Sequence, residues 1–123
     1  MSRAVILFAH GARDPAWAAP FERLRQLILD ILPDATVSLA YLELMQPALP
    51  EQVALHAAAG VTEICIIPVF LGQGGHVRRD LPLLITQLQQ AHPTLQFKVA
   101  TAVGEDDAVL QAIARYCIVS AGI

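Results

Sequence analysis

Apolar residues along this chain form two kinds of pattern, continuous runs and helical repeats. Continuous apolar runs rich in β-branched residues predict buried strands over residues 5–9, 36–42, 63–70 and 96–102. Apolar residues spaced by three and four predict one helix ending near 32, an Ala-rich helix ending at 60, a third over 81–88 and a fourth over 109–117. The predicted order is therefore strand, helix, strand, helix, throughout the chain.

Strict alternation of strands and helices indicates a parallel sheet with right-handed crossovers and helices on both faces. The sequence thus predicts an α/β three-layer sandwich around a four-stranded parallel sheet in the order 2-1-3-4, as in flavodoxin-like folds. No linker or repeat divides the chain, so residues 1–123 are expected to form one domain. Asp14 followed by Pro15 predicts where the first helix begins.

Two histidines follow strands that should be neighbours in such a sheet. His10 ends the first strand, and His76 follows the third strand and a glycine-rich loop over 72–75. Ligands bind beyond the carboxyl ends of strands where the strand order reverses, so both imidazoles should lie at one site. Neutral imidazole is a common transition-metal ligand and a base near neutral pH. Either residue alone could instead be a structural histidine.

Two histidines are too few for a closed structural zinc site, which needs four ligands. The prediction is an open site, completed by a substrate, by water or by a second chain. Glu43, just after the second strand, is the nearest carboxylate, unless it is only a solvated loop residue. His56 and His92 are expected at the surface or at helix ends. The cysteines, Cys65 and Cys117, are expected to be reduced and buried in the core.

Composition and missing motifs exclude several classes of function. The first strand-to-helix turn lacks Gly-x-Gly-x-x-Gly and no Gly-Lys-Ser/Thr follows the glycine-rich loop, which argues against NAD and ATP binding. A net charge of −3 with eight scattered basic residues argues against nucleic acid. Apolar runs are too short to span a membrane, and no signal peptide is recognisable, so a cytoplasmic protein is expected. An apolar share of 55% favours an oligomer.

Three segments together resemble a known family. They are residues 10–15 (His-Gly-Ala-Arg-Asp-Pro), 41–47 (starting Tyr-Leu-Glu-Leu) and 68–82 (from Pro-Val-Phe-Leu through Gly-His to Asp-Leu-Pro). They are similar to the type II metal chelatases of tetrapyrrole synthesis, most closely the short sirohydrochlorin cobaltochelatases of the CbiX type. The resemblance covers nearly the whole chain. One departure is Ala12, where the family usually has Ser, so a role for that hydroxyl is not carried over.

The resemblance implies a chelatase that inserts a divalent metal into sirohydrochlorin without ATP and without a permanently bound cofactor. Co²⁺ is the first expectation for the metal substrate, with Fe²⁺ and Ni²⁺ as alternatives. It implies that His10 and His76 bind the metal, that His10 also accepts pyrrole protons, and that Glu43 assists. The implied substrate contacts are Met45, Phe70, Leu71, Gly72, Gln73, Gly74 and Gly75.

Sirohydrochlorin is polyanionic, so its site needs positive potential. Arg13, Arg78 and Arg79 could supply it, or could simply be solvated. A metal or tetrapyrrole carrier using the same histidines is an alternative function. A histidine phosphatase is disfavoured, because that class needs Arg before the His, where this chain has Ala9. Longer chelatases contain two facing copies of such a unit, so 123 residues imply one half and a homodimer.

Overall fold

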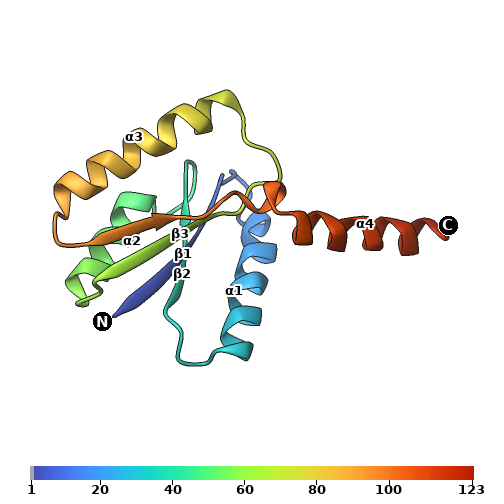
Figure 1. Ribbon diagram of the computed structural model, residues 1–123, viewed down its shortest axis with the longest axis horizontal. Coiled ribbons are helices and arrows are strands. Elements are labelled where there is room, and N and C mark those ends of the chain that lie inside the picture. Colours follow the sequence, from blue (N-terminus) through green and yellow to red (C-terminus); the bar gives the residue numbers. More distant parts are fainter. Residues whose placement is uncertain (1) are drawn as a thin grey trace.

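The computed structural model of the chain describes residues 2–123, apart from the side chain of His76. Its centre is a parallel four-stranded sheet in the order β2-β1-β3-β4, which confirms the predicted topology (Figure 1). The strands are β1 (Arg3–Ala9), β2 (Val37–Tyr41), β3 (Glu63–Pro68) and β4 (Gln96–Val99). The helices are α1 (Ala19–Ile31), α2 (Leu49–Ala58), α3 (Gly75–Ala91) and α4 (Asp107–Ala121), with short 3₁₀ turns η1 (Pro15–Ala18) and η2 (Val103–Glu105).

One face of the sheet is fully covered. Ile6 and Phe8 of β1 and Ile64 and Ile66 of β3 are completely buried beneath α2 and α3. Strand register places Ile6 beside Ile66, so apolar side chains from adjacent strands form one continuous layer. Burying such a side chain contributes about 1.5–3 kcal/mol each, which makes this face the main source of the fold's stability.

The opposite face is covered in part. Helix α1 packs over β2 and β1, where Ala9, Ala18 and Tyr41 form a smaller buried cluster. The Arg25 side chain reinforces this contact by donating from Nε to the Val37 carbonyl at 2.7 Å. Beyond α1, Cys65 and Ile67 of β3, and Val69 directly after it, are only half-buried.

Helix α4 forms where its periodicity predicts but does not cover the sheet. It extends away from the rest of the chain, to the right in Figure 1. The predicted helix is confirmed, while its predicted place on a sheet face is wrong, and with it the expected burial of the cysteines. Cys117 is exposed and Cys65 only half-buried. Periodicity identifies the apolar side of a helix, but it does not specify which surface covers that side.

Two local predictions are resolved by hydrogen bonds. The Asp14 carboxylate accepts from the Ala16 backbone N–H at 2.9 Å, as expected of a cap, although a 3₁₀ turn precedes α1. His56 lies in the last turn of α2, which fits the expected helix end, but it is not at the surface: its ring is buried and lies 2.8 Å from the Ser38 hydroxyl. His56 shares the inner face of α2 with the buried Val53, which explains its burial. Over residues 2–123, no helix is long and apolar enough to cross a membrane.

Candidate functional site at the carboxyl end of the sheet

His10 lies directly beyond β1, at the carboxyl end of the sheet. Its carbonyl accepts from the Glu43 N–H at 3.1 Å, which joins the ends of β1 and β2. The next residue, Gly11, has a φ of +92°, and a Cβ there would overlap the Glu43 carbonyl. Only glycine fits this close approach. The sequence His-Gly therefore fixes the backbone from which the imidazole projects.

The Phe70 ring packs against the imidazole of His10. The two ring centroids are 4.4 Å apart at 40°, and Phe70 in turn packs edge-on against Phe8 at 5.7 Å. Phe70 is itself buried, so its place is beneath His10 rather than on the open surface. The His10 ring is partly exposed, and its nitrogens make no hydrogen bond to any other described residue. A partly exposed ring that is held by packing, with nitrogens that bond none of the described residues, is suited to bind a ligand.

The segment after β2 lies beside His10 through its backbone. The Glu43 side chain is exposed, and Met45 packs against the Ala9 and Tyr41 cluster. Leu44 has a φ of 65°, which is uncommon for a residue other than glycine, and its side chain is 61% exposed. Leu44 directly follows Glu43, which bonds the His10 backbone, so its exposed apolar side chain is a candidate substrate contact.

The loop after β3 is held by a residue far along the chain. The Gly104 N–H donates to the Phe70 carbonyl at 2.9 Å, and a Cβ on Gly104 would overlap the Leu71 carbonyl. The Leu71 side chain is 66% exposed. Gln73 is half-buried, and the three loop glycines, Gly72, Gly74 and Gly75, are exposed. This loop therefore presents backbone groups and one apolar side chain close to His10.

His76 lies in the first turn of α3, but its side chain is outside the described part of the structure. The backbone places it at the carboxyl end of β3, next to β1, as the topology predicts. Its pairing with His10 stays a prediction. Among the side chains that are described, no three of the types His, Cys, Asp and Glu gather as a candidate metal site.

The candidate arginines differ in their surroundings. Arg78 lies 3.5 Å from the Glu105 carboxylate, and Arg79 donates from Nε to the Gly75 carbonyl at 3.2 Å. Arg13 is exposed and forms no ion pair with the residues described. A largely apolar cleft of about 520 Å³, lined partly by Gln73 and Arg78, opens under α3 at the ends of β3 and β4. His10 does not line it, so the cleft lies beside the His10 site.

Comparison with known proteins identifies the family. The model of the CbiX family matches residues 4–117. The chain belongs to the CbiX family. A sirohydrochlorin cobaltochelatase of Methanopyrus kandleri is 34% identical over 82 residues, which are 67% of this chain and 57% of that protein. One from Methanosarcina acetivorans is 29% identical over 67% of this chain and 63% of its own length. This CbiX-family chain thus spans about 60% of each of these two relatives.

Solved structures confirm the family fold. A CbiX protein from Marinobacter aquaeolei VT8 matches with a TM-score of 0.86 and 28% identity, over 98% of each chain. The sirohydrochlorin chelatase SirB of Bacillus subtilis subspecies spizizenii, in complex with cobalt, matches with a TM-score of 0.74 and 22% identity. That match covers 94% of the CbiX-family chain but 49% of SirB.

Sequence reasoning missed two residues of this site. Leu44 carried one usable signal, an exposed-type loop position occupied by an apolar residue between Glu43 and Pro47. Gly104 carried none, because its contact with Leu71 depends on how the end of β4 passes the loop after β3. Long-range contacts of this kind are set by tertiary packing and leave no local pattern.

Proposed function

We propose that this CbiX-family chain inserts a divalent metal ion into sirohydrochlorin without ATP. The observation that carries the proposal is the partly exposed His10 imidazole, which packs on Phe70 at the carboxyl end of the sheet and makes no hydrogen bond to another described side chain. The curated relatives named sirohydrochlorin cobaltochelatases support it, and so does the SirB chelatase with cobalt, through its shared fold. Co²⁺ is the first candidate for the metal substrate, followed by Fe²⁺ and Ni²⁺.

Metal insertion needs water removed from the ion and two protons removed from the pyrrole nitrogens. A neutral imidazole can replace a water ligand and, once the ion has moved on, accept a proton. His10 is proposed for both tasks, with His76 as a further metal ligand. Glu43, beside His10 in the backbone, would bring a carboxylate to the same ion.

The macrocycle is proposed to lie across the carboxyl end of the sheet. Leu44 and Leu71 are exposed, each directly follows a residue that contacts His10, and each suits the apolar face of a tetrapyrrole. Its carboxylates suit Arg13, Arg78 and the N-terminus of α3, which has no side-chain cap at Gly74. Substrate would compete with Glu105 for Arg78, since that ion pair is exposed and weak.

We further propose that two copies form one enzyme. The match covers 49% of SirB, which supports the proposal that this chain corresponds to one half of a two-unit chelatase. A symmetric homodimer would restore two facing units. The free cysteines suit a reducing compartment, so a cytoplasmic location is proposed.

The proposal is tested by anaerobic absorption spectroscopy of sirohydrochlorin with purified protein and Co²⁺, Fe²⁺ or Ni²⁺. A metal-dependent spectral change faster than in buffer, yielding more metallated product than protein, is expected. Product that stops at one equivalent per site would instead indicate a carrier. A rate equal to buffer with all three metals would contradict the proposed activity.

A further inference from the structure

The turn η2 lies against the loop that follows β3, although α3 and β4 separate the two in sequence (Figure 1). Gly104 of this turn donates its N–H to the Phe70 carbonyl at 2.9 Å. Within the described part of the chain, this is the only backbone hydrogen bond made by residues 70–73. The bond just before it joins the Val69 N–H to the Phe8 carbonyl at 2.8 Å. Beyond the sheet, the backbone of Phe70 is therefore tied through Gly104.

The loop on the other side of Phe70 gives its backbone little support. Gly72, Gly74 and Gly75 have open space where a Cβ would stand, so no neighbouring group restrains them closely. Glycine also has the greatest backbone freedom of any residue. A shift of the Phe70 backbone would thus meet little resistance from the residues that follow it, which leaves the bond from Gly104 as the main restraint on that side.

Phe70 connects this restraint to the candidate metal ligand His10. The Phe70 side chain is 2% exposed, and its ring centroid lies 4.4 Å from that of the imidazole. Packing against Phe8 restrains the ring within the core, while the backbone at residue 70 sets the point from which the ring projects. Moving that backbone would move the surface against which the imidazole rests. Gly104 is in this way connected to His10 through one intervening residue.

Glycine is required at position 104 for space and not for conformation. A Cβ there would overlap the Leu71 carbonyl and crowd the Leu71 Cα. Both atoms belong to the backbone, so no side chain can move aside to make room. The φ of Gly104 is not positive, in contrast to that of Gly11, so alanine can adopt the backbone of this turn. Gly104→Ala would therefore act by pushing the loop after β3 away from η2.

We propose that Gly104 is a positioning residue for metal insertion, which acts on His10 through Phe70. The inference rests on the proposed function, in which His10 binds the metal substrate. A group that orients a metal ligand without touching the metal contributes about 10- to 100-fold to affinity or activity. Gly104 has this place in the site, because its N–H fixes the residue that supports the imidazole.

A matched pair of variants separates positioning from stability. Val53 is fully buried on α2, so Val53→Ala costs stability without touching the loop after β3. Co²⁺ binding is measured by titration calorimetry without a tetrapyrrole, under conditions where circular dichroism shows both variants folded. The Kd should rise about 10-fold or more for Gly104→Ala and stay within about 2-fold for Val53→Ala. Equal shifts would make Gly104 a purely structural residue and overturn the proposal.

A double-mutant cycle tests the route through Phe70. Phe70→Leu removes the ring but keeps an apolar side chain in the core. With the ring absent, Gly104→Ala should raise the Kd for Co²⁺ by less than about 3-fold, because the group that it displaces no longer supports the imidazole. An undiminished effect would mean that Gly104 reaches the site by another route and would contradict the proposal.

Amide hydrogen exchange of the wild-type chain gives a test that needs no variant. If the bond from Gly104 to Phe70 favours Co²⁺ binding, Co²⁺ must favour that bond by the same factor. Exchange of the Gly104 N–H should therefore slow by about 10-fold or more at saturating Co²⁺. The control is the Thr62 N–H, which bonds the Ser2 carbonyl at the amino end of the sheet and should change by less than about 2-fold. Equal slowing at both amides, or none at Gly104, would refute the role.

These readouts use Co²⁺ alone, so their failure is distinct from failure of the proposed function. A Kd that responds to Gly104→Ala in a chain that does not metallate sirohydrochlorin would contradict the activity and support the positioning role. Metallation by the wild-type chain, with a Kd that does not respond to Gly104→Ala, would support the activity and overturn the positioning role.

Discussion

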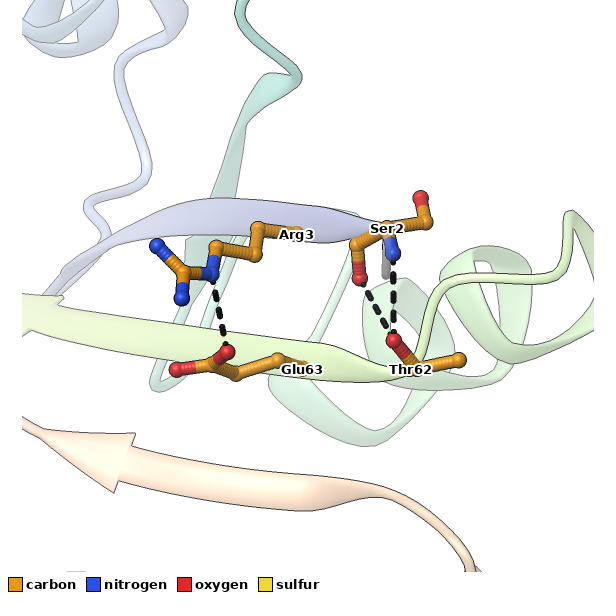
Figure 2. A network of polar contacts seen from close by, with 4 residues as sticks. All are labelled: Ser2, Arg3, Thr62 and Glu63. Carbon is orange, nitrogen blue, oxygen red and sulfur yellow. Dashed lines mark hydrogen bonds and ion pairs between the residues drawn. The ribbon is translucent and has the colours of Figure 1, made fainter.

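Polar side chains at the two ends of the sheet differ in their hydrogen bonding. At the amino end, β1 and β3 are joined by the Arg3–Glu63 ion pair at 3.0 Å and by Thr62, whose hydroxyl accepts from the Ser2 N–H and donates to the Ser2 carbonyl (Figure 2). At the carboxyl end, the His10 imidazole has no hydrogen-bond partner among the described residues. Polar groups bonded within the chain stabilise it, whereas an unbonded group beside a loop is free for a ligand.

Two histidines show the same contrast. His56 is buried in the last turn of α2, 2.8 Å from the Ser38 hydroxyl at the start of β2, and burial lowers its pKa. His10 is partly exposed and is held by its contact with the Phe70 ring. Histidine is thus a structural residue at the amino end of the sheet and a candidate functional residue at the carboxyl end.

The largest expected effect separates the two ends by activity. His10→Ala removes the proposed metal ligand and proton acceptor, and should slow metal insertion by at least about 100-fold. His92→Ala is the matched control, because His92 caps the far end of α3. Initial rates of sirohydrochlorin metallation, with circular dichroism to check folding, measure both. Equal rates for the two variants would remove the functional distinction between the ends. His76→Ala should match His10→Ala if it supplies the second ligand.

The next prediction compares two glycines, Gly11 and Gly60, which both have a positive φ. Gly60, between α2 and β3, has a φ of +87° and open space around it, so Gly60→Ala should cost only about 1–2 kcal/mol. Gly11→Ala should cost more and also slow insertion, because its Cβ would displace the Glu43 carbonyl beside His10. Urea unfolding and metallation rates measure the pair. Equal losses of stability would show that the close approach at Gly11 is unimportant.

A smaller effect concerns the pH dependence of stability. Because the pKa of His56 is lowered by burial, the unfolded chain binds a proton there more readily than the folded one. His56 therefore leaves stability intact above its ordinary pKa of 6.5 and lowers it as the pH falls from 6.5 toward the shifted value. His56→Gln, which does not titrate, should flatten this part of the profile. Urea midpoints between pH 5 and 8 measure it, and an unchanged slope would contradict the assignment.

Sequence patterns predicted the strands, their order and the position of His10. Each depends on local or topological regularity, such as the apolar run over residues 5–9 and the rule that places ligands beyond strand ends. The patterns did not predict that His56, in the last turn of α2, is buried, although its spacing from Val53 put it on the inner face of that helix. A histidine whose ring is hydrogen-bonded can be buried, so residue type alone does not place it at the surface.

Placement of α4 could not be predicted in the same way. Its apolar face was evident, but the direction of the helix is fixed by Gly104 against Leu71, a contact between distant segments. The burial of Phe70 beneath His10 likewise depends on the packing of β1 against β3. Both features are set by tertiary contacts, which hydrophobic periodicity does not record.

The smallest expected effect is at the amino end itself. Arg3→Ala removes an ion pair whose arginine side chain is 73% exposed, and water screens such a pair, so a loss of about 0–1 kcal/mol is expected. A double-mutant cycle with Glu63→Gln in urea measures the coupling, which should fall further in high salt. Metal insertion should be unchanged in both variants. A slower insertion at unchanged stability would mean that the amino end acts on the distant His10 site, and the contrast between the two ends would fail.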